Sequence, residues 1–250
     1  MITTDQNLDK LSKWLCSYEI ESYSEIKDLI DFELKTFDEW HLKIKEKEKK
    51  LKKQQEELIK KKYRDPYEEE ILDSNINDFL SEQDQFYIAF EQEVFQMLLI
   101  KIYTKFEISL KVLYTQTNDK PLTTDKFEEI KKSYKKNLNI DFTLIPNFIE
   151  IQKLRIFNNN FKHYGNTVSL KTSKEICKFN LFEILKDYIE ASKYNKITQK
   201  YSQLEDKKDP EFTKELYLSM IKIDLTKQQI IDFYTIAYNF LKTIYMQLYP

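Results

Sequence analysis

The chain of 250 residues contains one glycine, Gly165, and five prolines. β-Sandwiches and barrels need many turns, and those turns draw on glycine and proline. A chain with so few glycines and prolines is typical of helices joined by short polar connections. The sequence therefore predicts an all-α fold. The same scarcity argues against glycine-rich phosphate-binding loops, and with them the P-loop and dinucleotide-binding classes of protein.

A folded, cytoplasmic protein is expected from the composition. Hydrophobic residues make up 41% of the chain, and 17 phenylalanines and 17 tyrosines argue against disorder. Cys16 and Cys177 lie far apart in sequence, which suits a reducing compartment better than a disulfide framework. No signal-peptide pattern opens the chain, and the most apolar stretch, residues 94–103, is too short to span a bilayer. We therefore expect no membrane partner.

Charge is distributed unevenly although the net charge is only −2. Residues 43–64 hold eleven basic and four acidic side chains, whereas residues 65–93 hold ten acidic and no basic ones. This asymmetry is consistent with self-association, with intramolecular pairing or with contact to a polyanion such as RNA. The basic stretch lacks interleaved aromatic residues, which favours a solvated helix over an RNA-binding one.

Two regions are predicted. Residues 1–80 form N-terminal helices and a long charged arm, in which Phe37, Ile44, Leu51 and Leu58 recur every seven residues. That thin seam is compatible with a solvated arm packed along one edge or with a short coiled coil. Asp65-Pro66 ends the arm, and residues 67–83 are expected to be irregular or briefly helical.

Residues 81–250 are predicted to form a helix bundle. Its first helix, about 81–116, is apolar nearly all round and therefore central. Further helices are expected from Thr124 through Asn137, from Pro146 through the segment described next, and at about 174–192, 193–206, 211–222 and 227–248. Residues 167–173 could be extended, and Thr226 is a plausible cap for the last helix.

The most chemically suggestive segment is residues 154–169, LRIFNNNFKHYGNTVS, which holds one of two arginines, one of two histidines and the only glycine. On a helix, Arg155, Asn159 and His163 fall at i, i+4 and i+8 and share one face. Imidazole can move a proton near neutral pH, and a guanidinium can bind the charge that grows on a phosphate. These are the groups that metal-free RNA cleavage needs.

One histidine cannot serve at once as separate base and acid. Arg155 and His163 are also roughly 12 Å apart along a continuous helix, so they could flank a phosphate without touching. A symmetric dimer would supply a second copy of each group. We therefore expect a homodimer with a two-fold interface across this face.

The pattern Arg155-x4-Asn160-x2-His163, in the form RIFNNNFKHYG, resembles the HEPN superfamily of α-helical nucleases and nucleotide-binding proteins. The resemblance implies a four- or five-helix bundle, a composite site in a dimer, and metal-independent RNA cleavage in toxin–antitoxin or antiphage defence. It implies a phosphate-binding role for Arg155, a catalytic role for His163 and an accessory role for Asn160 or Asn159. The chain has seven residues between Arg155 and His163, where HEPN motifs usually have four to six.

Another interpretation of the segment is structural. A histidine in the last turn before a glycine complements the helix dipole, so His163 could act as part of a C-terminal cap, alone or together with a catalytic role. The protein would then be a non-catalytic helical interaction protein that docks a partner through its charged arm. Neither interpretation calls for a cofactor or a metal ion. An inhibitory or activating protein partner is compatible with both.

Overall fold

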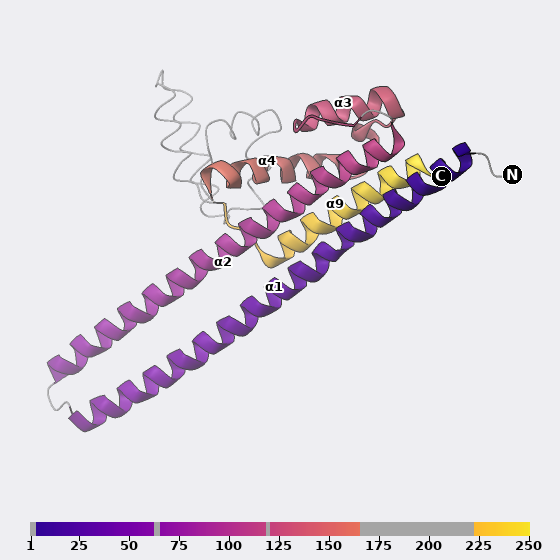
Figure 1. Cartoon of the computed structure of the whole chain (residues 1–250). Helices are drawn as coiled ribbons and strands as arrows, with labels where there is room; N and C mark the ends of the chain where they lie inside the picture. Colours follow the sequence, from indigo (N-terminus) through magenta and orange to yellow (C-terminus); the bar gives the residue numbers. More distant parts are fainter. Residues whose placement is uncertain (1–3, 63–65, 119–120, 166–222) are drawn as a thin grey trace, which may run out of the picture. The chain divides into compact units, whose positions relative to one another are not determined.

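The computed structural model describes residues 4–62, 66–118, 121–165 and 223–250. They form helices α1 (Thr4–Lys62), α2 (Pro66–Thr117), α3 (Phe127–Leu138), the 3-10 helix η1 (Phe142–Leu144), α4 (Phe148–Tyr164) and α9 (Lys227–Leu248) (Figure 1). This part of the chain contains no strand, which confirms the all-α prediction. The extended segment predicted at 167–173 and the helices predicted between 174 and 222 lie outside the described residues.

The chain divides into two compact units. The first, which we call the bundle unit, comprises Met1–Asp28 and Phe95–Pro250, and the second, the hairpin unit, comprises Leu29–Val94. α1 and α2 each contribute residues to both units. The boundary predicted after residue 80 falls within α2, inside the hairpin unit.

Both long helices are continuous where the sequence predicted interruptions. α1 runs without a break through the N-terminal region and the charged arm, which were predicted as separate helices, and it ends at Lys62, just before the predicted stop at Asp65-Pro66. α2 begins at Pro66 and is continuous through residues 67–83, which were predicted to be irregular or only briefly helical. Proline is favoured in the first turn of a helix, and neither glycine nor proline follows it up to Thr117 to break the helix.

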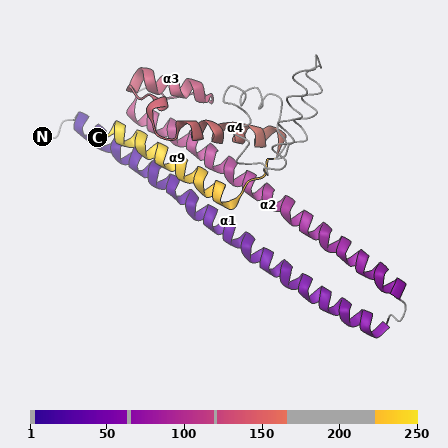
Figure 2. The ribbon, with the colours of Figure 1, turned by 180° about the vertical axis from the view of Figure 1, so that it is seen from behind.

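The hairpin unit consists of the second half of α1 and the first part of α2, which run side by side in opposite directions (Figures 1 and 2). Buried rings of Phe37 and Tyr87 meet at 4.8 Å between centroids and join the two helices. Leu51, which lies further along the predicted heptad seam, is exposed, so the seam is not buried along its whole length. The charged arm is thus one helix of an antiparallel pair with a thin apolar seam.

The bundle unit has an aromatic core. The ring of Phe240 on α9 packs edge-on against Phe106 of α2, at 5.9 Å, and against Phe142 of η1, at 5.4 Å. Thr226 begins α9 with a capping box, in which its hydroxyl accepts from the Gln229 N–H and the Gln229 side chain accepts from the Thr226 N–H. The predicted cap at Thr226 is thereby confirmed.

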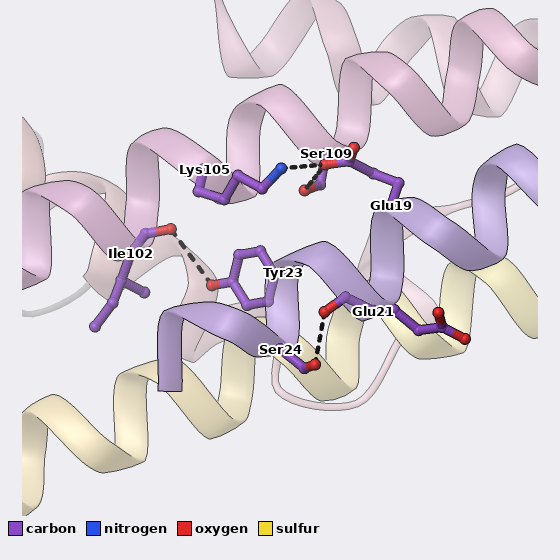
Figure 3. A network of polar contacts seen from close by, with 7 residues as sticks. All are labelled: Glu19, Glu21, Tyr23, Ser24, Ile102, Lys105 and Ser109. Carbon is purple, nitrogen blue, oxygen red and sulfur yellow. Dashed lines mark hydrogen bonds and ion pairs between the residues drawn. The ribbon is translucent and has the colours of Figure 1, made fainter. Parts of the chain in front are cut away.

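The first 28 residues belong to the bundle unit because they add both apolar and polar contacts to it. Tyr23 stacks on Tyr234 of α9, and its hydroxyl donates a hydrogen bond of 3.3 Å to the Ile102 carbonyl of α2. Glu19 receives hydrogen bonds from Lys105 and Ser109, also on α2 (Figure 3). None of the described helices is apolar over a long enough stretch to cross a membrane.

Candidate functional site

Helix α4 carries the predicted site and is packed on nearly all sides. Between residues 151 and 163 the buried side chains are Ile151, Gln152, Leu154, Ile156, Phe157, Asn158, Asn160 and Phe161. Four of the remaining side chains lie within one arc of about 100° around the helix: Arg155, Asn159, Lys162 and His163. We call these four the open arc. The predicted stripe is therefore exposed at Asn159 and His163 and half-buried at Arg155, whereas Gln152, which lies in the same arc one turn before Arg155, is buried.

Aromatic packing sets the rotation of α4. Phe157 is fully buried, stacks on Phe161 and meets Phe233 of α9 edge-on at 6.2 Å. Figures 1 and 2 both show α4 close to α9. Because Phe157 and Phe161 face the core, the arc on the other side of the helix faces outward.

Arg155 is half-buried at the inner edge of the open arc. Its Nε donates a hydrogen bond of 3.1 Å to Oε1 of Gln152, which is itself buried one turn earlier. Its charge also opposes the rise in the pKa of Tyr103 that burial and the nearby Glu107 carboxylate cause. The hydrogen bond to Gln152 holds the guanidinium against α4.

Asn159 and Asn160 are adjacent in sequence but occupy different environments. Asn159 is exposed, and its Oδ1 accepts a hydrogen bond of 3.3 Å from Nδ2 of Asn158. Asn160 is fully buried, and its Nδ2 donates a bond of 3.0 Å to the Gly165 carbonyl. Asn159 thus lies in the open arc, whereas Asn160 ties down the turn that follows the helix.

The only glycine in the chain ends α4. Gly165 has φ 62° and ψ −140°, a combination that is essentially restricted to glycine. His163 is exposed in the last helical turn, where a cation complements the helix dipole. The predicted C-terminal cap position and an outward-facing imidazole are therefore compatible.

Helix α2 adds polar neighbours to the open arc that the sequence analysis did not identify. Lys162 Nζ donates a hydrogen bond of 3.3 Å to Thr104 Oγ1. Burial raises the pKa of the Glu107 carboxyl, an effect that the Tyr103 hydroxyl and the charges of Lys162 and Lys111 oppose. The sequence signal for Glu107 was a carboxylate within the mostly apolar stretch 98–113 of α2, because a charged group is costly to bury.

On α4, Oδ1 of Asn158 is a buried polar atom without a hydrogen bond to any described residue. Buried polar atoms are nearly always satisfied, so unpaired ones are unusual and cluster at functional or strained positions.

The arrangement presents two cations and an imidazole on one helical face, a combination suited to binding a phosphate and moving a proton beside it. Within the described part of the chain, no group of three His, Cys, Asp or Glu side chains is placed to hold a metal ion. Comparisons with protein-family models, with curated proteins and with solved structures found no match.

Proposed function

We propose that this protein is a metal-independent endoribonuclease effector of HEPN type. The observation that carries the proposal is the open arc of α4, in which half-buried Arg155 and exposed Asn159 and His163 share one side of the helix, while most side chains between residues 151 and 161 are buried.

The proposed reaction is an attack of a ribose 2′-hydroxyl on the adjacent phosphorus. A new O–P bond forms to the 2′ oxygen while the bond to the 5′ oxygen breaks, leaving a 2′,3′-cyclic phosphate and a 5′-hydroxyl. His163 transfers a proton to or from these oxygens. Arg155, with Lys162 beside it, stabilises the charge on the phosphate oxygens, and Asn159 holds one of them by a hydrogen bond.

Two proton transfers are needed, one from the attacking and one to the leaving oxygen. His163 supplies one of them in each copy, so a second copy supplies the other in a composite site at a dimer interface. An inhibitory protein partner would keep such an effector silent, and an activating partner would switch it on. A role in a toxin–antitoxin or antiphage system follows from the HEPN resemblance.

Activity on total cellular RNA in excess EDTA tests the proposal. Wild type should cut RNA and leave cyclic-phosphate ends, whereas Arg155→Ala and His163→Ala should each lower the rate by about 100-fold or more. Two variants of neighbouring residues serve as controls. Lys153→Ala removes a cation of the same helix that pairs with Glu150, and Tyr164→Ala changes the residue next to His163.

Wild type, the two site variants and the two controls should first be shown to have the same helical circular dichroism, so that differences in cleavage reflect the site and not folding. Loss of cleavage in the two site variants but not in the two controls supports the proposal. Equal cleavage by all five proteins points to a contaminant or another site and rejects the assignment. No cleavage by wild type, even with cell lysate added as a source of activator, favours the alternative function.

The alternative is a non-catalytic helical interaction protein. The observation that favours it is the hairpin unit, which exposes large apolar side chains including Trp40, Phe86 and Phe90. In that case His163 and Gly165 would act only in ending α4. Exposed apolar groups of this size are more common at interaction surfaces than elsewhere on a monomer.

A further inference from the structure

Three aromatic side chains lie together on one side of the hairpin unit and remain exposed. Trp40 of α1 is 36% exposed, and Phe86 and Phe90 of α2 are 62% and 39% exposed. Trp40 meets Phe90 edge-on at 5.2 Å, and Phe86 lies one helical turn before Phe90. We call these three residues the aromatic flank. Exposed apolar groups that adjoin one another in this way mark interaction surfaces.

The two helices of the hairpin are held in a defined register. The imidazole of His41 packs edge-on against Tyr87 at 4.1 Å, and Phe37 contacts both Tyr87 and Phe90. Since α1 and α2 run in opposite directions, residues after His41 lie level with residues before Tyr87 (Figures 1 and 2). Residues 43–53 of α1 are therefore level with the part of α2 that precedes the aromatic flank.

These level segments carry opposite charge. Exposed lysines occur on α1 at Lys43, Lys45, Lys47, Lys49, Lys50, Lys52 and Lys53. Exposed acids occur on α2 at Asp78, Glu82 and Asp84. Among the described residues no ion pair joins these lysines to these acids. The hairpin thus presents a basic helix and an acidic helix side by side, next to an exposed aromatic cluster.

We infer that the hairpin unit is a self-association element, and that a second copy of the chain packs its own aromatic flank on this one. Trp40 of each copy then covers Phe86 and Phe90 of the other. The basic part of α1 lies over the acidic part of the other copy's α2. This inference does not depend on the proposed ribonuclease activity.

Charge decides between the two symmetric ways of stacking the flanks. A two-fold axis parallel to the helices lays each α1 on the opposite α2, so that unlike charges face each other. A two-fold axis perpendicular to the helices, in the plane of the interface, lays α1 on α1 in the opposite direction, so that the charged segments of the two copies extend away from each other. Only the first arrangement brings unlike charges together across the interface, so charge favours it.

A second copy fits this surface better than another kind of partner. RNA would match the lysines of α1 but would be repelled by the acids of α2 beside them. A uniformly acidic or basic protein would likewise match one helix and oppose the other. A surface that carries both signs next to an apolar cluster is complementary to itself, as a two-fold interface requires.

Sedimentation equilibrium of the full chain, at low and high salt, tests the inference. Wild type should form a dimer that weakens as salt screens the charges. Phe86→Glu should raise the dissociation constant at least about tenfold, because it places a charge in the apolar contact. Ile88→Glu is the matched control, since Ile88 is 56% exposed but lies about 160° around the same helix.

A monomeric wild type, or equal effects of Phe86→Glu and Ile88→Glu, overturns the inference. A dimer that tightens with salt overturns the proposed axis. Helical circular dichroism of each variant distinguishes loss of association from loss of folding.

Charge reversal gives a second, independent readout. One variant carries Lys43→Glu and Lys47→Glu, and the other carries Asp78→Lys and Glu82→Lys. Each alone places like charges across both halves of the interface and should dimerise more weakly than wild type. Mixed together, they restore unlike charges at both halves, so the mixture should form heterodimers. Absence of heterodimers from the mixture rejects the arrangement.

Discussion

The carboxylate of Glu19 on α1 lies 2.8 Å from the ammonium group of Lys105 on α2 (Figure 3). The same oxygen, Oε1, accepts a hydrogen bond of 2.6 Å from Ser109, whose side chain is fully buried. The two helices are thereby joined inside the bundle unit by a charge-assisted contact. Removing one partner of such a contact costs more than the contact itself contributes, because the others are left unsatisfied.

Glu19→Ala should lower the free energy of unfolding by about 2 kcal/mol, because it leaves Lys105 and Ser109 without their acceptor. Urea denaturation followed by circular dichroism measures the change. Glu21→Ala is the control, since Glu21 is exposed two residues away and should change stability by less than about 0.5 kcal/mol. Equal losses in both variants would show that the Glu19 contact contributes nothing specific.

Asn160→Ala should destabilise the protein by about 1 kcal/mol, since it removes a buried hydrogen bond to the Gly165 carbonyl. Asn159→Ala, its exposed neighbour, should change stability by less than about 0.5 kcal/mol. Thermal unfolding of both variants beside wild type measures this difference. An Asn160→Ala protein as stable as wild type would argue that the turn after α4 is held by other contacts.

The Asp141 side chain should show a pH effect in acid. Hydrogen bonds from Lys135 and from Thr143 lower the pKa of Asp141 to about 2, below the usual carboxyl value of about 3.9. The folded state therefore favours the charged form, so its stabilising effect is complete above about pH 4 and is lost as pH falls toward 2. Carbon-13 NMR titration of the carboxyl measures the pKa directly.

A matched variant connects that pKa with stability. Asp141→Asn should be less stable than wild type at neutral pH, and the two proteins should become equally stable near pH 2. A constant difference over this range would contradict an electrostatic origin.

Glu107 should show the opposite pH dependence. Burial raises the pKa of its carboxyl, so the folded state binds the proton more tightly than the unfolded state does. Its contribution to stability therefore falls as pH rises from about 4.3, the ordinary glutamate value, through the raised pKa. Glu107→Gln mimics the protonated form and should gain stability relative to wild type as pH increases.

Chemical denaturation at several pH values between 4 and 7 measures the Glu107 effect. Exposed Glu93 of the same helix, changed to Gln, provides the control and should give a flat difference. A Glu107→Gln variant whose advantage shrinks with rising pH would reverse the sign and refute the assignment.

Features that depend on local chemistry could be predicted from the sequence. Thr226 caps α9 because a hydroxyl three residues before Gln229 satisfies the free amide groups of the first turn. Pro66 separates α1 from α2 because the residue before a proline disfavours the helical conformation. The shared face of Arg155, Asn159 and His163 likewise follows from the period of a helix alone.

Features that depend on contacts between residues distant in the chain could not be predicted from the sequence. Asn159 and Asn160 are chemically identical neighbours, and each was an equally good candidate for an accessory site residue. Phe157 packing on Phe233, more than 70 residues away along the chain, fixes the rotation of α4 and so exposes one asparagine and buries the other.

The sequence by itself thus determined the helical class of the fold, the positions of several helix ends and the face of α4 that carries the candidate groups. Only the tertiary structure decided that residues 1–28 pack with residues after 95, and that Glu107 lies near Lys162. The reason is physical. Caps and helical periods act over a few residues, whereas burial and the pKa of a carboxyl depend on which helices meet in space.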